Sequence, residues 1–240
     1  MSDIDGAEAL LGVVVPYDMA LDAELWRWAP ADVSLLFTRT PYVDLPVTVE
    51  MAETVGDAGT VADGVRALHV VGPQAYAYGC TSGSFVRGVA GEREIVAAMT
   101  QAGSAPAVTT SGAILAALDA LGVSSVAAIT PYDEAVTERF SRFLTEAGHP
   151  VVGSAHLGLH ERIWEVDYAT TRDLVRAGDD GAADAIVISC TNLPTYGLIA
   201  ELEDELGKPV ISANQATMWA LLRLVARRGV GSGQRLFDVD

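Results

Sequence analysis

Short apolar runs alternate with longer amphipathic stretches along almost the whole chain. The first run, Leu10–Val15, is continuous and stops at Pro16, which is typical of a strand buried on both faces. Further strands are predicted at Val33–Thr38, within Ala67–Gly79, and at Ala107–Val108, Val123–Thr130, Pro150–Val152, Ala185–Ser189 and Pro209–Ile211. Because strands and helices alternate, the pattern predicts an α/β fold with mainly parallel sheets flanked by helices.

The stretches between the strands are predicted to be helical. Ser84 or a neighbour is expected to cap a helix that runs to about Ala102. The helix predicted at Val47–Arg66 is expected to be interrupted near Gly56–Gly59. The remaining helices are predicted at Asp22–Trp28, Ala113–Leu121, Asp133–Ala147, Asp167–Ala177, Tyr196–Leu206 and Thr217–Val225. The last dozen residues, with glycines at every second position from 229 to 233, are expected to form a loose tail.

Three segments of the first half recur in the second half in the same order. The repeats are spaced by 115 residues (Pro16 to Pro131), 110 residues (Cys80 to Cys190) and 103 residues (Pro106 to Pro209). A period this long indicates a duplicated lobe, because solenoid units repeat every ~20–50 residues. We therefore expect two pseudo-symmetric lobes, residues 1–115 and 116–215, with the active site in the cleft between them. The helix in the final segment, residues 216–240, is expected to pack back on the first lobe.

Composition narrows the class of protein. Fifteen basic residues stand against 32 acidic ones, giving a net charge of −17. That balance argues against nucleic acid and anionic membranes as partners. No apolar run approaches the ~20 residues of a spanning helix, and Met1–Gly6 lacks the basic region of a signal peptide. A cytoplasmic location is expected, where the two cysteines remain free thiols.

The four histidines do not indicate a metal site. Only His156 and His160 are spaced at i, i+4, and neither has a cysteine ligand nearby in the sequence. All four, including His69 and His149, are expected to be solvated surface residues, and no metal is predicted.

The two cysteines are the chain's best candidates for chemistry. Cys80 and Cys190 each follow a predicted strand and precede a threonine, at the strand ends where open α/β sheets expose reactive groups. One thiolate can remove a proton next to a carboxylate while the other thiol protonates the opposite face. A thiolate can instead add to a double bond and leave, which allows cis–trans isomerisation.

Either route requires the thiol pKa of ~8.5 to be lowered, and the helix terminus after the strand can contribute. The hydroxyls of Thr81, Ser82 and Thr191 could hold a substrate carboxylate. The alternative is that each cysteine only fills the core, since free cysteine is often buried. Their matching places in a repeated lobe favour function.

These residues resemble a known superfamily. The segments Val13–Pro16, Cys80–Phe85, Thr130–Tyr132 and Val187–Cys190 are similar to those of the aspartate/glutamate racemase superfamily, in the branch of maleate cis–trans isomerases and arylmalonate decarboxylases. The resemblance extends from Gly12 to about Val225. It implies two α/β lobes, a substrate cleft between them and no cofactor.

The resemblance also assigns site residues. Cys80 and Cys190 match the two catalytic cysteines, and Tyr132 matches a tyrosine that binds a substrate carboxylate. Thr81 and Ser82 match residues of the carboxylate pocket. The backbone N–H of Thr191 is expected in the same pocket, and Pro16, Asp18 and Asn192 are expected to complete the substrate-binding set. Without the resemblance, Tyr132 could equally be a packing tyrosine.

The chain departs from these relatives at three places. The decarboxylases have glycine where this chain has Cys80, which favours an isomerase or racemase. Maleate isomerases have asparagines near the positions of Asp18 and of the 160–162 loop. Asp18 would repel a dicarboxylate unless it is protonated or paired with an amine, which favours an amino-acid-like substrate. Arg162 is a candidate carboxylate clamp, with a solvated loop arginine as the alternative.

The sequence thus predicts a cofactor-independent isomerase or racemase of a small carboxylate or dicarboxylate. Maleate isomerisation and amino-acid racemisation both stay open, as does a homo-oligomer. One alternative is an arylmalonate-type decarboxylase in which Cys190 is the proton donor. Another is a non-catalytic carboxylate-binding protein. A nucleotide-binding oxidoreductase is disfavoured because Gly83, Gly88 and Gly91 do not form G-x-G-x-x-G.

Overall fold

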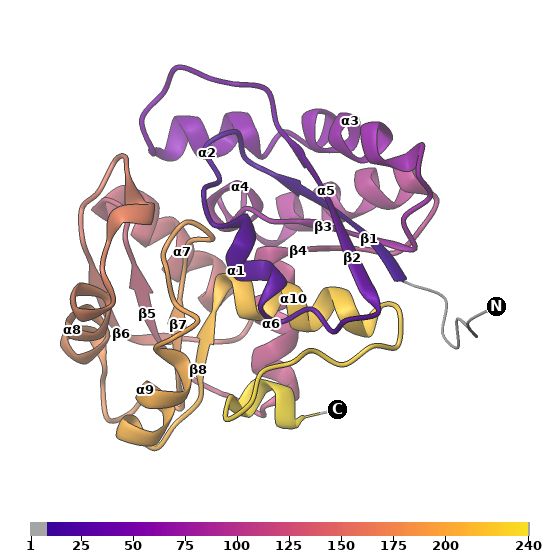
Figure 1. The fold of residues 1–240 in the computed structure, drawn as a ribbon. Helices are drawn as coiled ribbons and strands as arrows, with labels where there is room; N and C mark the ends of the chain where they lie inside the picture. The colour runs from indigo at the N-terminus through magenta and orange to yellow at the C-terminus, as the bar shows by residue number, and fades with distance from the viewer. Residues whose placement is uncertain (1–8, 240) are drawn as a thin grey trace.

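The computed structural model describes residues 9–239 and contains two four-stranded parallel sheets (Figure 1). The prediction that the chain lacks a signal peptide rested on Met1–Gly6, and this segment lies outside the described residues. The first sheet comprises β1 (Ala9–Val15), β2 (Val33–Arg39), β3 (Ala75–Tyr78) and β4 (Ala107–Thr109). The second comprises β5 (Val126–Thr130), β6 (Val151–His156), β7 (Ala185–Ile188) and β8 (Val210–Ser212). All eight predicted strands are present.

The two sheets have the same topology. Their strand orders are β2-β1-β3-β4 and β6-β5-β7-β8, and every pairing is parallel. Each half therefore places its strands in the order second, first, third, fourth, which confirms the repeat predicted from the sequence. Since parallel strands end at the same edge of a sheet, β3 and β7 deliver Cys80 and Cys190 to equivalent places.

Helices cover the sheets and join them. Figure 1 shows the first lobe above, the second lobe below it to the left, and α6 and α10 between the two. The helices are α1 (Asp22–Trp26), α2 (Val49–Val55), α3 (Ala58–His69), α4 (Thr81–Phe85), α5 (Gly88–Gly103), α6 (Thr110–Ala120), α7 (Glu134–Glu146), α8 (Tyr168–Gly178), α9 (Ile199–Leu206) and α10 (Ala213–Arg223). Two short 3₁₀ turns complete the described fold, η1 (Ile163–Glu165) and η2 (Arg235–Asp238).

Two helix predictions were wrong in detail. The segment expected to be one helix capped by Ser84 forms α4 and α5, and Ser84 lies inside α4, where its hydroxyl donates to the Cys80 carbonyl at 2.7 Å. Helix α10 begins at Ala213 rather than Thr217. Ser212 and Gln215 form a capping box there, in which each side chain bonds the other residue's backbone N–H, so the helix starts four residues earlier.

The C-terminal segment is packed, contrary to the prediction of a loose tail. Leu236 is fully buried, and the Gln234 side chain accepts a hydrogen bond from Trp28 Nε1 at 2.8 Å. Because Trp28 is itself fully buried, this bond satisfies a polar group that would otherwise be costly to enclose.

Of the helices described, none is long and apolar enough to span a membrane.

Candidate active site

Cys80 and Cys190 lie at matching corners after β3 and β7. Cys80 is the N-cap residue of α4 and has extended backbone geometry. Cys190 has φ of 87°, in the left-handed region that non-glycine residues seldom adopt. Such strain persists only where surrounding contacts enforce it, and it concentrates at functional sites.

A hydrogen bond joins the two corners directly. The backbone N–H of Cys190 donates to Thr81 Oγ1 at 3.2 Å, across the boundary between the lobes. Both residues are buried. The threonine that follows the first cysteine therefore fixes the backbone that carries the second cysteine, and the two corners form one site.

The corners line a small cavity between the lobes. Its enclosed volume is about 20 Å³, far below the ~300–1,000 Å³ of typical ligand pockets, so a ligand must widen the cavity to bind. Nine of the ten predicted site residues line it, together with three apolar side chains: Pro16, Asp18, Cys80, Thr81, Ser82, Tyr132, Cys190, Thr191 and Asn192, with Val47, Met51 and Ile163.

The loop after β1 carries Asp18 into this cavity, and Asn192 holds the loop in place. Asn192 Nδ2 donates to the Asp18 carbonyl at 3.0 Å, and Asn192 Oδ1 accepts from the Ala20 N–H at 2.8 Å. Among the described residues, the Asp18 Oδ1 atom is buried without a hydrogen-bond partner. Burial raises the pKa of the Asp18 carboxyl. Asn192 thus positions Asp18, whose own carboxyl is available to a ligand.

Cys80 lies among several hydrogen-bond donors. Burial raises the pKa of its thiol, and the charge of Asp18 adds to the rise. The Gly83 N–H, the Tyr78 hydroxyl and the Ser82 hydroxyl lower the pKa and partly oppose burial. Ser82 Oγ lies 3.8 Å from the sulfur. Ser84, one turn into α4, bonds Ser111 Oγ at 2.7 Å and supports the corner from behind.

Cys190 is more strongly protonated. Burial, with a smaller contribution from the charges of Asp18 and Cys80, raises the pKa of its thiol to about 12. The Tyr132 hydroxyl and the Asn192 N–H lower it only in part. The donors of the strand-to-helix corner lower the pKa of both thiols, as expected, but desolvation outweighs them, so the pKa of each cysteine is raised overall. Cys190 rests as a neutral thiol, which suits a proton donor.

Tyr132 is buried beside Cys190 at the base of the cavity. Its oxygen lies 3.5 Å from Ser189 Oγ, which donates to it, and its ring packs edge-on against Phe85. Burial raises its pKa well above the usual value, so the hydroxyl stays protonated as a hydrogen-bond donor. That is the form needed to bind a carboxylate.

Arg162 is the one predicted site residue outside the cavity. Its side chain is 64% exposed and forms an ion pair with Glu165 at 2.6 Å. It borders the mouth, where two loops from opposite lobes meet: the Val47 N–H donates to the His160 carbonyl at 2.8 Å. The solvated-arginine alternative fits this position.

The histidine prediction holds for three of the four residues. His69, His156 and His160 are exposed, whereas His149 is buried and its Nδ1 lies 3.1 Å from the Val123 carbonyl. In residues 9–239, no group of three His, Cys, Asp or Glu side chains is close enough to hold a metal ion.

Sequence analysis missed the three apolar residues of the cavity. Met51 lies on α2, Val47 in the loop before it and Ile163 in η1. They come from segments with no polar motif, so only the tertiary fold brings them together. The only feature of the sequence that could have indicated any of them is a hydrophobic residue within a loop.

The fold and site define a two-lobed α/β protein with a cysteine-lined cavity between its lobes. The chain belongs to the arylmalonate decarboxylase family, whose sequence model matches residues 47–237. It is 36% identical to arylmalonate decarboxylase from Bordetella bronchiseptica, over 95% of this chain and 96% of that protein. It is 30% identical to maleate isomerase from Geobacillus stearothermophilus, over 50% of this chain and 49% of that protein.

A solved structure agrees over nearly the whole chain. It is a liganded arylmalonate decarboxylase in which a glycine is replaced by cysteine and a cysteine by serine. It has a TM-score of 0.87 and 33% sequence identity, over 96% of this chain and 99% of that chain.

Proposed function

We propose that the protein is a cofactor-independent isomerase or racemase of a small carboxylate, in which two cysteines serve either as acid and base at the carbon next to the carboxylate or, for cis–trans isomerisation, with one as a nucleophile that adds to the double bond and leaves again. The observation that carries the proposal is that Cys80 and Cys190, from different lobes, line one small cavity. A substrate held there has one thiol on each side. Membership of a family that contains a cofactor-independent decarboxylase, and similarity to maleate isomerase, support the same kind of chemistry.

The environments of the two thiols assign their roles. Cys80 has three donors that stabilise its thiolate, so it is the base or nucleophile. Its thiolate takes the proton from the α-carbon, and the C–H electron pair moves onto the carboxylate to give an enediolate. Cys190, which rests as a thiol, then gives its proton to the opposite face. Tyr132 and Ser82 hold the developing oxyanion.

Asp18 favours a substrate with an amine. Its carboxyl faces the cavity with one buried oxygen unpaired, and a second substrate carboxylate there would repel it. An ammonium group would satisfy the unpaired oxygen. We therefore rank amino-acid racemisation above maleate isomerisation, which requires a protonated Asp18.

A decarboxylase is the second candidate, and two observations favour it. The arylmalonate decarboxylase match covers 95% of the chain, whereas the maleate isomerase match covers half. A neutral Cys190 thiol is also suited to protonating the carbanion that remains after carbon dioxide leaves. In that mechanism Cys80 is not required.

The test is proton NMR in deuterium oxide with three sets of substrates: L- and D-amino acids, maleate, and substituted malonates. Deuterium at the α-carbon with loss of enantiomeric purity establishes a racemase. Fumarate formed from maleate establishes an isomerase. Loss of carbon dioxide from a malonate establishes the decarboxylase.

Single-cysteine variants separate the mechanisms. Cys80→Ser and Cys190→Ser should each abolish racemisation or isomerisation, because each removes one of two required groups. Cys80→Gly should leave a decarboxylase largely active. Arg66→Gln, an exposed arginine of α3 that pairs with Asp63 and does not line the cavity, is the matched control and should retain turnover. Full turnover by both serine variants on the established substrate would refute the two-cysteine mechanism.

A further inference from the structure

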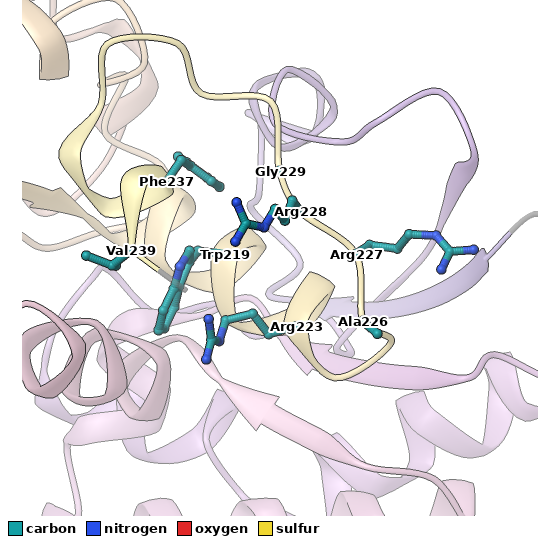
Figure 2. A pocket seen from close by; sticks show the side chains of 8 residues that line it. All are labelled: Trp219, Arg223, Ala226, Arg227, Arg228, Gly229, Phe237 and Val239. Carbon is teal, nitrogen blue, oxygen red and sulfur yellow. The ribbon is translucent and has the colours of Figure 1, made fainter.

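The pocket where α10 ends has its cationic groups already engaged (Figure 2). The Arg223 guanidinium lies 4.7 Å from the centre of the Trp219 ring, and Arg227 pairs with Asp32 at 2.7 Å. Arg228 also has an interaction partner. A polar group with two alternative partners lies elsewhere, behind Cys80 at the end of β3.

That group is the hydroxyl of Tyr78, the last residue of β3, whose side chain is fully buried. The hydroxyl donates to the Val55 carbonyl, at the end of α2, at 2.7 Å. The same hydroxyl also hydrogen-bonds the Cys80 thiol. Gly83 leaves room for this approach, because a Cβ there would collide with the Tyr78 oxygen and lie 3.2 Å from the Cys80 sulfur. The tyrosine oxygen therefore has a carbonyl and a reactive sulfur as neighbours.

A hydroxyl has one proton to donate and two lone pairs with which to accept. While Cys80 is a thiol, the Tyr78 proton is used on the Val55 carbonyl, and the S–H group can donate to the Tyr78 oxygen. A thiolate has no proton and can only accept. Because a hydrogen bond to a charged group is roughly twice as strong as a neutral one, ionisation of Cys80 favours turning the Tyr78 proton toward the sulfur.

Tyr78 keeps its proton throughout. Burial and the charge of Cys80 raise the pKa of the hydroxyl well above its usual value. The change of partner is therefore a rotation about one C–O bond, with the heavy atoms in place. The Val55 carbonyl loses this donor when the rotation occurs, so the net stabilisation of the thiolate is the difference between the two bonds.

The second lobe has no hydroxyl at the matching position. The residue 110 positions further on, at the end of β7, is Ile188. In both lobes the cysteine follows two residues later. The duplication is thus broken by an aliphatic residue behind Cys190, the thiol whose pKa is raised to about 12. The difference between Tyr78 and Ile188 favours the thiolate at Cys80.

We propose that Tyr78 is a positioning residue for Cys80, whose hydroxyl turns from the Val55 carbonyl to the sulfur when the thiol ionises and turns back when the sulfur is protonated. The proposal rests on the proposed function, in which Cys80 is the base or nucleophile. Tyr78 does not line the cavity, so it acts on a substrate only through Cys80. In the proton-transfer route, the proton that leaves the α-carbon ends on the Cys80 sulfur.

The test titrates the Cys80 thiol by NMR and needs no substrate. In the full chain with Cys190→Ser, here the parent, Cys80 is the one remaining cysteine, so isotope labelling at cysteine Cβ gives one signal that moves as the thiol ionises. Adding Tyr78→Phe removes a donor to the thiolate. The thiolate fraction at a given pH should then fall about tenfold, with the titration displaced to higher pH.

Tyr76→Phe is the matched control. Tyr76 is also fully buried on β3, but its hydroxyl lies 3.3 Å from His69 Nδ1. This variant should titrate like the parent. Tryptophan fluorescence over the same pH range shows that each variant is folded. A purely structural role for Tyr78 would lower the urea midpoint of Tyr78→Phe and leave the Cys80 titration unchanged.

The inference is overturned if Tyr78→Phe titrates like the parent, if Tyr76→Phe is displaced as far, or if Cys80 in the parent does not ionise below about pH 11. On the established substrate, with Cys190 intact, Tyr78→Phe should lose kcat/KM at neutral pH and regain most of it at alkaline pH. A displaced titration together with turnover that needs neither cysteine would refute the proposed function alone. Turnover that needs both cysteines with an unchanged titration would refute only the role of Tyr78.

Discussion

At the scale of single residues, burial controls both cysteines. The thiol of Cys190 is buried, and desolvation rather than a neighbouring base keeps it protonated. Cys190 therefore stays protonated at neutral pH and can act as the proton donor. The thiolate that the mechanism requires forms at Cys80, where hydrogen-bond donors of α4 oppose part of the rise in pKa that burial causes.

This burial predicts a pH dependence of stability. The folded-state pKa of Cys190, about 12, lies above the unfolded value of ~8.5, so the folded protein binds the proton more tightly. The stabilisation is fully present below about pH 8.5 and is lost as pH rises toward 12. Cys190→Ser should therefore show a shallower alkaline decline of unfolding free energy, by up to about 1.4 kcal/mol per pH unit. Urea unfolding from pH 7 to 11 measures it; parallel curves for the two proteins would contradict it.

Thr81 gives a second residue-scale prediction. Thr81→Val keeps the shape of the side chain but leaves the buried Cys190 N–H without its acceptor. The expected cost is about 1–3 kcal/mol of unfolding free energy, with a lower kcat because the strained Cys190 backbone loses its restraint. Thr81→Ser keeps the hydroxyl and is the control. Equal denaturation midpoints for Val and Ser variants would show that the bond contributes nothing.

At the scale of elements, α2 and α4 meet through glycines. A Cβ at Gly56 would collide with the Gly83 carbonyl, and a Cβ at Gly83 would collide with the Tyr78 hydroxyl. The second contact lies beside Cys80. The close approach of α2 therefore fixes the short helix that carries the first cysteine.

Gly56→Ala should displace α4 and with it Cys80. The expected cost is about 1–3 kcal/mol of stability, as for other overpacked contacts, together with a fall in kcat/KM of tenfold or more. Gly181→Ala is the matched control, because a Cβ there has nothing within 4 Å. Urea denaturation and turnover on the established substrate provide the measurements. Wild-type kcat/KM for Gly56→Ala would show that α4 is not fixed through this contact.

Element types were largely predictable, and element ends were less so. Apolar runs identified strands such as β1, β5 and β7 because strands buried on both faces show almost no polar residues. The start of α10 was misplaced because polar Asn214 and Gln215 do not resemble buried helical residues. Both are fully enclosed by the other lobe and by the C-terminal segment: Asn214 Nδ2 donates to Glu24 at 2.5 Å and Gln215 Nε2 to Gln234 at 3.0 Å.

At the scale of the whole molecule, net charge opposes compactness. The chain carries −17, and most of its ion pairs are exposed and contribute little. Sodium chloride should therefore raise the urea midpoint, because screening of the overall repulsion outweighs the weakening of the surface pairs. The comparison is between ionic strengths of roughly 0.01 and 0.5 M, where the Debye length falls from about 30 Å to a few ångströms. A lower midpoint at high salt would mean that the ion pairs dominate.

The sequence by itself determined the two-lobed α/β architecture and the repeat, because strand burial and duplicated order are visible along the chain. Reactive residues at strand ends indicated Cys80 and Cys190, whereas other cavity residues, such as Tyr132, were expected only through the resemblance to a known superfamily. Tertiary structure alone decided the thiol protonation, the left-handed Cys190 backbone, the position of Arg162 outside the cavity and the packed C-terminal segment. Each of these depends on desolvation or on contacts between residues more than a hundred positions apart, such as Thr81 with Cys190 and Trp28 with Gln234.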